Sequence, residues 1–539
     1  MTTDIRFALQ GRVVTMDEQD TVLPDGVIYV RGNKIAAVSN ATTAKPAGFE
    51  NVPIITSSGT IYPGLIDLHN HLSYDALKLW QVPKRYTNRD DWARHPDYRR
   101  LISGPMNVLG RTASYPEAIS RYVECKCLLG GVTTAQGIAL FSNTGIIRFY
   151  RGFLRNAEVS DGPDLPAAEA RIADVVAEDA TAFLKHLRSS SCLLLHLSEG
   201  TDQRARNHFN ALKLDNGEIA ITRALAGIHC VALQSADFAL LARHGGSMIW
   251  SPLSNMLLYG TTADVHAAKA AGVTIGIGSD WSPSGSKNLL GELKVARAYS
   301  DTANDVFSNL EIVAMATRNA AKILRWDKAV GSLEASKRAD LIVVRGKKAK
   351  DPYLQLIASR ETDIELVMID GVRRCGIPSL MADNPDMLES WTIAGETRRL
   401  NLSGTDVDPL VARLTLRDAA DRLAHGLKSL KNLAEALEKQ EPVRHGAAAG
   451  GETQWFLALD HEEPAGMSIR PRFDEERNAP ARIESLLAAA AAKPLSQLLG
   501  PLELDAMTAV DDAGFLTGLD KQINLPKAIK DRVKRLHVK

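Results

Sequence analysis

The middle of the chain alternates between short apolar runs and helix-like stretches. The apolar runs cover residues 130–140, 191–200, 226–233, 245–252 and 272–280. Near-continuous apolar strands separated by helices are typical of a parallel sheet with helices packed on it. Repeated over about 270 residues, this pattern predicts a TIM-like (β/α)8 barrel over residues 63–330, with a long insertion at 72–115. No clear run marks the strand expected between about 150 and 190.

Strand-like patterns flank this region on both sides. GVIYVRGNKIAAVS (26–39) contains a Gly-Asn turn, and strand character returns in GSLEASKRADLIVV (331–344) and ELVMIDGVRR (365–374). We expect residues 1–62 and 331–380 to form the two halves of one small β-sandwich domain. The predicted fold class is therefore α/β: a barrel, a β-sandwich built from both flanks, and a third region.

That third region, residues 381–539, is expected to be a mainly helical extension whose role the sequence does not assign. A helical seam of apolar residues favours an intramolecular packing face over a coiled-coil partner site. The seam comprises Leu416, Ala420, Leu423, Leu427, Leu430, Ala434 and Leu437. A further helix is predicted over 482–493, where Pro494 ends it.

Polar residues stand at the carboxyl ends of the predicted strands, which is where barrel active sites lie. His69 and His71 end the first strand, and residues two apart in a strand point to the same side. His196, His229 and Asp280 end later strands, and Glu199 follows His196 by three residues. Two converging imidazoles suit a metal such as zinc, although two chance polar residues in a turn would give the same motif.

PGLIDLHNH (63–71), HLSE (196–199), HC (229–230), SPLSN (251–255) and GSD (278–280) occur in this order. GRVVTMD (11–17), ATRNAAKIL (316–324) and ADLIVV (339–344) flank them. In these motifs the chain resembles the amidohydrolase superfamily, in its branch of cytosine deaminase, guanine deaminase and triazine chlorohydrolase relatives. The resemblance covers roughly residues 5–375 and leaves 380–539 outside it.

The resemblance implies one divalent metal ion, zinc or alternatively iron, bound by His69, His71, His196 and Asp280. It also implies that Glu199 protonates a ring nitrogen of the substrate and that His229 steadies the attacking oxygen. Asp280 would accept a proton from the water that attacks. In physical terms, three neutral imidazoles and one carboxylate leave a position open for water, whose pKa the metal lowers.

Two features depart from the relatives and concern the substrate. Trp250 stands where many relatives have histidine, and an indole can stack on a flat ring, so we expect it in the substrate pocket. The 72–115 insertion should sit at the same rim. Its arginines are expected to form a solvated face, with contact to an anionic substrate as the alternative (Arg85, Arg89, Arg94, Arg99 and Arg100). Gln136, at the end of another strand, is a second candidate for contact with the substrate.

Composition narrows the class of protein. Lys+Arg and Asp+Glu both total 64 in 539 residues, and this zero net charge argues against a nucleic-acid or membrane-surface partner. The chain has no predicted membrane span or signal peptide, and its five scattered cysteines fit a reducing compartment, so a cytoplasmic location is expected.

We expect a hydrolase that acts on a small molecule at a non-peptide C–N bond, by deaminating a nitrogen heterocycle. Hydrolysis of an amide, lactam or urea-type bond is the first alternative. A catalytically idle barrel that serves as a scaffold is the second. Whether the chain forms a homo-oligomer is left open.

Overall fold

Eight short parallel strands follow one another through the middle of the chain in the computed structural model. The structure describes residues 6–171, 180–381, 388–404, 407–439, 453–459 and 493–538. The strands are β5 (Leu65–Asp67), β6 (Val132–Ala135), β9 (Arg155–Asn156), β10 (Glu169–Arg171), β11 (Leu193–Leu197), β12 (Leu225–His229), β13 (Ser247–Trp250) and β14 (Thr274–Ile277). The strand that had no clear run between about 150 and 190 is thus represented by the very short β9 and β10.

These strands form two parallel sheets, ordered β5-β6-β9 and β10-β11-β12-β13-β14. Backbone hydrogen bonds link the sheets at both edges. Leu68 N donates to Ile277 O (3.3 Å) beside β5 and β14, and Ala168 N donates to Ala157 O (2.8 Å) between β9 and β10. The first and last strands are therefore neighbours, and their carboxyl ends meet.

Alternation along each strand divides its residues between two apolar clusters. Leu194, Ile228 and Ile249 belong to one buried cluster, together with Ile66 and Leu68 of the first strand and its end. Their neighbours, such as Leu195 and Trp250, join the larger cluster that includes the surrounding helices.

The helices that accompany these strands are α4 (Tyr115–Leu129), α5 (Ala180–Ser189), α6 (Gln203–Asn210), α7 (Ser235–Arg243), α8 (Pro252–Tyr259), α9 (Val265–Ala270), α10 (Leu289–Thr302), α11 (Asn309–Met315) and α12 (Arg318–Leu324). Many have polar N-caps: the Asn288 side chain, for example, accepts a hydrogen bond from Gly291 N at the start of α10. The insertion holds η1 (Leu72–Ala76), α1 (Arg89–Ala93), α2 (Pro96–Tyr98), η2 (Arg99–Ser103) and α3 (Gly104–Arg111).

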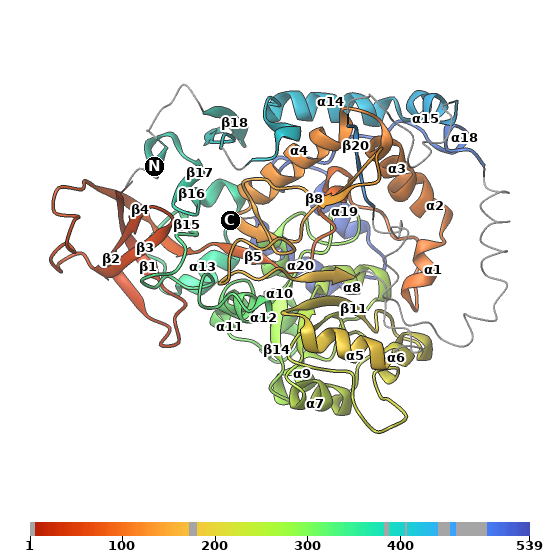
Figure 1. Ribbon diagram of the computed structural model, residues 1–539, viewed down its shortest axis with the longest axis horizontal. Coiled ribbons are helices and arrows are strands. Elements are labelled where there is room, and N and C mark those ends of the chain that lie inside the picture. The colour runs from red at the N-terminus through yellow and green to blue at the C-terminus, as the bar shows by residue number, and fades with distance from the viewer. Residues whose placement is uncertain are drawn as a thin grey trace.

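The two flanks pair into one nine-stranded sheet, in the order β18-β19-β17-β16-β15-β4-β1-β2-β3. Its strands are β1 (Arg6–Val14), β2 (Val22–Arg31), β3 (Lys34–Asn40), β4 (Ile54–Pro63), β15 (Leu341–Val344), β16 (Ile364–Ile369), β17 (Val372–Gly376), β18 (Glu389–Ile393) and β19 (Glu396–Leu400). The flanks meet where β15 runs antiparallel to β4, with Leu341 opposite Pro63. Most of this sheet lies at one end of the molecule, with α13 (Pro352–Ile357) beside it (Figure 1). Because β18 and β19 belong to it, the sheet continues beyond the predicted limit at residue 380.

The described part of the C-terminal extension is mainly helical and packs on the rest of the chain. It contains α14 (Leu416–Lys428), α15 (Leu430–Glu438), β20 (Trp455–Leu457), α18 (Leu495–Leu498), α19 (Phe515–Lys521) and α20 (Lys527–His537). Five of the seven residues of the predicted apolar seam are buried and the other two are partly buried against the same core. Helix α14 contacts α4 there, so the seam is an intramolecular face. The helix predicted over 482–493 lies outside the described residues, apart from Lys493.

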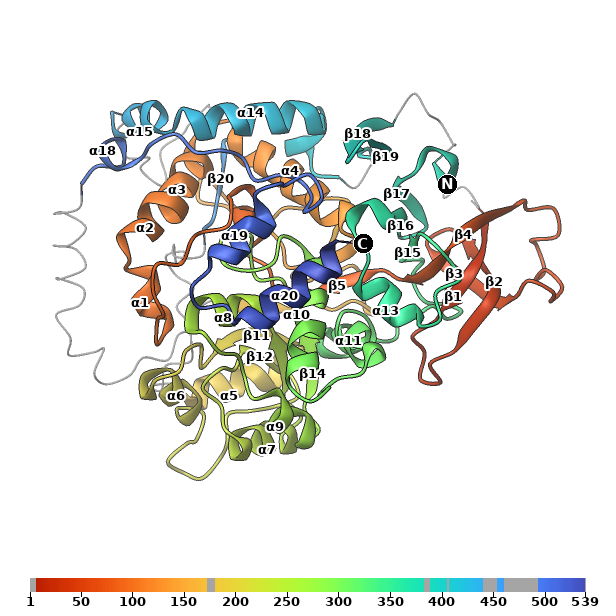
Figure 2. The same ribbon diagram turned by 180° about the vertical axis from the view of Figure 1, so that it is seen from behind.

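Two further contacts pack the C-terminal extension against the rest of the chain. β20 pairs with β7 (Ala139–Ser142), which in turn pairs with β8 (Ile147–Phe149). α20 lies along α10, and Figure 2 shows α19 and α20 on the face of the molecule turned toward the viewer. Among the described helices, none has the length and apolar character needed to cross a membrane.

Candidate active site

Four histidines and one aspartate meet at the carboxyl ends of the parallel strands. The ring centroid of His69 lies 4.8 Å from that of His71, 4.7 Å from that of His196 and 5.3 Å from that of His229. Oδ1 of Asp280 lies 3.2 Å from Nε2 of His69 and 3.5 Å from Nε2 of His71. The site residues predicted as metal ligands are therefore brought together, from strands that are far apart in the sequence.

The backbone at this site adopts an uncommon conformation. His229 and Asp280 both have φ of +66°, in the left-handed region that residues with a β-carbon seldom occupy. Such strain persists only where surrounding contacts hold it, and it concentrates at functional sites. At Asp280 those contacts are backbone hydrogen bonds with the first strand's end: Asp280 N donates to His69 O (2.9 Å) and His71 N donates to Asp280 O (2.6 Å).

Amide oxygens fix the orientation of two of the imidazoles. Nδ1 of His69 lies 2.9 Å from Oε1 of Gln136, and Nδ1 of His229 lies 2.9 Å from Oδ1 of Asn255. A carboxamide oxygen only accepts hydrogen bonds, so each Nδ1 carries the proton. Each Nε2 is then left with its lone pair, which is the tautomer that a metal ligand needs.

Burial keeps the imidazoles of His69 and His196 neutral. It lowers the pKa of His69 to about 4, against the opposing effect of Asp280. Burial and the positive charge of Arg89 also lower the pKa of His196. Burial alone would raise the pKa of Asp280, but the adjoining His69 and the other imidazoles outweigh it and the net shift is downward. Neutral imidazoles beside a carboxylate are the protonation states in which a divalent metal binds.

The cluster suits a metal ion on its own geometry. One ligand atom from each of His69, His196 and His229 lies within 4.8 Å of the others, and the same holds for His69, His71 and Asp280. Nε2 of His69 is buried and has no hydrogen-bond partner among the described residues. An orphaned imidazole nitrogen facing a carboxylate and other imidazoles fits a tetrahedral or five-coordinate zinc site.

Glu199 is buried beside the cluster. Among the described residues, its hydrogen-bond partner is Tyr259 and not one of the predicted metal ligands. Its Oε1 accepts a hydrogen bond from the Tyr259 hydroxyl (2.7 Å), and its Oε2 lies 3.8 Å from Nε2 of His229. The Tyr259 hydroxyl itself accepts from Nε1 of Trp92 (2.9 Å) in the insertion. Arg89, also in the insertion, approaches Oε2 of Glu199 to 3.9 Å. A carboxyl in this position can carry a proton to a bound molecule.

Comparison with known proteins shows the family to which the chain belongs. The amidohydrolase family model matches residues 171–374. A 5-methylthioadenosine/S-adenosylhomocysteine deaminase of Thermoanaerobacter pseudethanolicus is 31% identical over 406 residues, which cover 67% of this chain and 91% of that protein. The chain belongs to the amidohydrolase family. The predicted resemblance is thus confirmed, and with it an α/β fold and the hydrolysis of non-peptide C–N bonds.

More distant relatives of this amidohydrolase have solved structures. An adenosine deaminase from Xanthomonas campestris with bound zinc is 19% identical, with a TM-score of 0.54 over 77% of this chain and 98% of that one. An atrazine chlorohydrolase from Arthrobacter aurescens TC1, complexed with zinc, is 20% identical, with a TM-score of 0.51 over 68% and 94%. These likenesses show a shared fold.

The structure does not support substrate contact for Trp250. This side chain is fully buried on the helix-facing side of β13, against Tyr299 and Phe307, with ring centroids 5.4 and 5.8 Å away. Its Nε1 donates to Oγ1 of Thr262 (2.7 Å). The expectation that Trp250 stacks on a substrate is therefore corrected: strand alternation turns Ile249 inward and Trp250 outward.

Gln136 lies at the end of β6 as expected, but its side-chain oxygen contacts a different partner from the expected one. Its Oε1 faces Nδ1 of His69 and accepts a hydrogen bond from Asn70 N (3.0 Å). In this amidohydrolase it orients a cluster histidine rather than reaching for substrate through that oxygen. The insertion arginines are also not all solvated, because Arg89 is only 22% exposed and lies beside Glu199.

Three residues of the site were missed by sequence reasoning. Asn255 and Tyr259 contact His229 and Glu199, and their four-residue spacing on α8 places them on one helix face. That spacing, within and just after the SPLSN motif, was the available signal. Asp67, whose carboxylate accepts from Ser279 N (3.0 Å) and Oγ (2.5 Å), joins the ends of β5 and β14. Burial raises the pKa of Asp67 to about 7.

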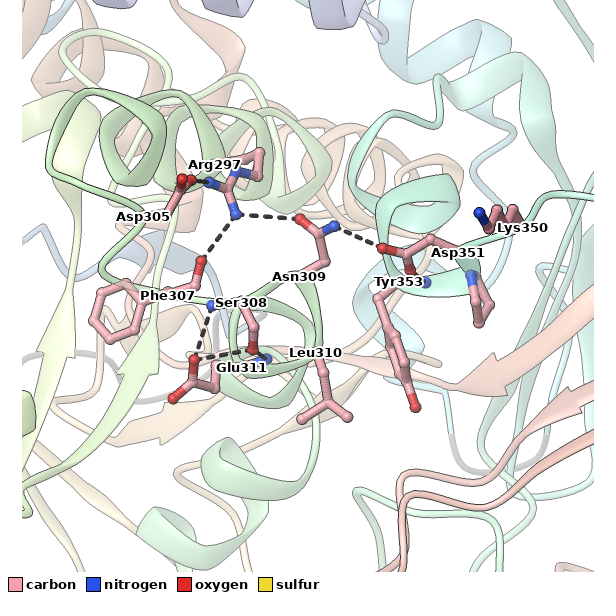
Figure 3. Close-up of a pocket in the computed structure, with 11 residues that line it drawn as sticks. Arg297, Asp305, Phe307, Ser308, Asn309, Leu310, Glu311, Lys350, Asp351 and Tyr353 are labelled. Carbon is pink, nitrogen blue, oxygen red and sulfur yellow. Dashed lines mark hydrogen bonds and ion pairs between the residues drawn. The ribbon is translucent and has the colours of Figure 1, made fainter.

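A groove of about 730 Å³ opens elsewhere on the surface, between the end of α10, the start of α11 and α13 (Figure 3). Arg297, one of several charged residues at its wall, is already engaged: it donates to Asp301 (2.7 Å), Asp305 (2.5 Å) and Phe307 O (2.8 Å). None of the cluster residues lines this groove. The histidine cluster and this groove are therefore separate sites on the described part of the chain.

Proposed function

We propose that this amidohydrolase deaminates a nitrogen heterocycle of the aminopurine or aminotriazine type. Water adds to the ring carbon that bears the amino group, the C–N bond breaks, and ammonia and the corresponding oxo compound leave. The observation that carries the proposal is Glu199, a buried carboxyl beside the cluster that Tyr259 holds through a hydrogen bond of 2.7 Å. A deaminase needs such a proton carrier in addition to its metal ligands.

His69, His71, His196 and Asp280 would hold one divalent ion, and the donor set together with the two zinc-bound relatives favours zinc. Zinc bound there supplies a Lewis acid that makes water acidic enough to react near neutral pH. Gln136 keeps the proton of His69 on Nδ1, and this leaves Nε2 available.

The remaining steps belong to residues of the chain. Asp280, whose lowered pKa keeps its carboxylate ionised beforehand, takes a proton from the attacking water and passes it to the amino group, which leaves as ammonia. Glu199 gives a proton to a ring nitrogen as the water attacks, and so neutralises the charge that develops on the ring. It recovers a proton from the added hydroxyl as the oxo group forms. His229, whose Nδ1 proton is held by Asn255, accepts a hydrogen bond from the attacking water through Nε2 and so fixes the direction of attack.

The relatives support this class of substrate. The deaminase of T. pseudethanolicus and the adenosine deaminase of X. campestris are named for aminopurine compounds. An S-triazine hydrolase of Gordonia rubripertincta, 23% identical over 62% of this chain and 81% of that protein, is named for a smaller ring. We further infer that the eight parallel strands close into a barrel and that the nine-stranded sheet curls into a sandwich.

Metal analysis followed by an ammonia-release screen tests the function. Purified wild-type protein should contain about one zinc per chain and release ammonia from at least one aminated purine nucleoside, purine base or aminotriazine. His69→Ala should lose both properties, while Glu199→Gln should keep the zinc and lose the turnover. Ring opening of a lactam or cleavage of a urea without ammonia from any aminated ring would favour the amide-hydrolase alternative. Protein without metal would contradict both.

A further inference from the structure

A buried group of charges joins the C-terminal extension to the barrel. Oδ2 of Asp505 accepts from Nζ of Lys126 on α4 (2.6 Å), and both oxygens of Asp505 accept from Nζ of Lys287 (2.6 and 2.7 Å). The three side chains are between 1% and 3% exposed. Asp505 belongs to the extension, which lies beyond the residues that the family model matches.

Lys126 also contacts the two loops that carry His71 and Asp280. Nζ of Lys126 also donates to Asp75 O (2.8 Å) and to Oγ of Ser282 (2.7 Å). Oδ1 of Asp75 in turn accepts from Ser282 N (2.7 Å). Asp75 follows His71 by four residues and Ser282 follows Asp280 by two. Lys126 therefore stands where the loop after β5 meets the loop after β14.

Charge balance explains why Asp505 is needed there. An ammonium removed from water is costly unless a counter-charge contacts it closely. Lys287 has a second partner in Asp512, whose Oδ2 lies 2.9 Å from its Nζ. For Lys126 the carboxylate in direct contact is Asp505, because Asp75 meets it through a backbone oxygen and its carboxyl acts on Lys126 only at longer range. Without Asp505, the Lys126 ammonium would keep no carboxylate in contact at the junction of the two loops.

The extension also contacts the insertion near Glu199. Nε2 of Gln522 donates to Trp80 O (2.7 Å), and its Oε1 accepts from Val82 N (3.2 Å). Nδ2 of Asn524 donates to Lys84 O (2.9 Å) and to Leu257 O of α8 (2.8 Å). The segment from Asp505 to Asn524 thus touches the loops after β5 and β14, the insertion and α8.

We propose that Asp505 is a positioning residue, which holds the two metal-ligand loops in register through Lys126 and makes the C-terminal extension a part of the active site. This inference rests on the metal site of the proposed function. The extension is then neither a separate module nor a partner-binding arm: its described segments complete the support of His71 and Asp280.

Three variants of the full-length zinc protein test the proposal. Asp505→Asn removes the counter-charge, and Lys126→Met removes the arm that reaches the loops while Asp505 stays paired with Lys287. Asp408→Asn is the matched control, because Asp408 is another buried aspartate of the extension whose Oδ1 accepts from Nη2 of Arg148 on β8 (3.0 Å). Lys126→Met and Asp408→Asn each remove one ion pair of a buried aspartate, and Asp505→Asn removes two, to Lys126 and Lys287. None of the contacts described for the Asp408 side chain is with the loops after β5 and β14.

The measurements are the rate of zinc transfer to a chelator without substrate, the visible spectrum of the cobalt-substituted protein, and the urea midpoint. Asp505→Asn and Lys126→Met should release zinc on the order of 10-fold faster or more and alter the cobalt spectrum, as outer contacts of metal ligands do. Asp408→Asn should lower the urea midpoint and leave zinc release within about twofold of wild type.

The result that overturns the proposal is folded Lys126→Met protein with wild-type zinc release and cobalt spectrum. Equal acceleration by Asp408→Asn would overturn it as well, since the effect would then follow stability alone. Should Asp505→Asn fail to fold, Lys126→Met decides, because it leaves no carboxylate unpaired. Wild-type protein that binds no zinc would instead contradict the proposed function, so the two failures are distinguishable.

Discussion

Replacing Glu199 by glutamine separates proton transfer from every other property of the site. The amide has the size of the carboxyl, and its oxygen can still accept the Tyr259 hydrogen bond of 2.7 Å. It cannot deliver a proton. General acid-base groups contribute about 10²- to 10⁴-fold, so the activation free energy should rise by about 2.7–5.5 kcal/mol. Loss of one hydrogen bond would cost only about 0.5–1.5 kcal/mol, or roughly 2- to 13-fold.

Tyr259→Phe provides the matched comparison, because it removes that hydrogen bond and keeps the carboxyl. Steady-state ammonia release should give kcat/KM at least 10-fold lower for Glu199→Gln than for Tyr259→Phe, and zinc content should be unchanged in both. Glu199 lies 3.8 Å from His229 and is no predicted metal ligand, so its replacement should spare the metal. A Glu199→Gln enzyme within twofold of wild type would refute the assignment of the proton carrier. Loss of zinc from Glu199→Gln would refute the prediction that Glu199 is not a metal ligand.

The other predictions concern positions whose contacts are equally well defined. Gln136→Leu removes the acceptor for Nδ1 of His69 (2.9 Å) and should weaken zinc binding by about 10- to 100-fold in a chelator competition, whereas Gln136→Glu, which keeps an acceptor, should not. Trp250→Phe should lower the free energy of unfolding by about 1–3 kcal/mol in urea titrations and leave KM within twofold, because the indole fills core space and bonds Thr262; a raised KM with unchanged stability would restore the stacking hypothesis. Burial raises the pKa of Glu124 from 4.5 to about 7. Between pH 4.5 and 7 the folded protein therefore keeps a proton on Glu124 that the unfolded chain has already released. The contribution of Glu124 to the free energy of unfolding is complete below pH 4.5 and should fall by up to about 3 kcal/mol as the pH rises to 7. Glu124→Gln should flatten this part of the pH profile of urea unfolding, and an unchanged profile would contradict the raised pKa.

Sequence reasoning succeeded where chemistry coincides with a local signal. Each cluster residue follows an apolar run, and the carboxyl ends of parallel strands meet on one side, so strand ends alone were enough to bring His69, His196 and Asp280 together. The pairing of the two flanks was also predictable, because both sides of the barrel return to strand character. β9 and β10 were not, since they are only two and three residues long and have no apolar run of their own.

What could not be predicted depends on contacts between residues far apart in the sequence. Trp250 ends a strand just as the cluster histidines do, but only the register of β13 against its neighbours decides whether it faces the strands' interior or the helices. The partner of Lys126 lies 379 residues away, so no local pattern indicates it. Gln136 was singled out correctly as a strand-end residue, but its partner is a protein histidine.

Helix α8 connects the site to the two segments that the family motifs did not explain. One face of it supplies Asn255 to His229 and Tyr259 to Glu199. The carbonyl groups near its end accept from the other segments: Leu258 O from Tyr86 N of the insertion (2.9 Å), and Leu257 O from Nδ2 of Asn524. A shift of the insertion would therefore move Tyr259, and with it the hydrogen bond that holds Glu199. A displacement of either segment can therefore move the Glu199 carboxyl while the proposed metal ligands, which sit at the ends of the strands, stay where they are.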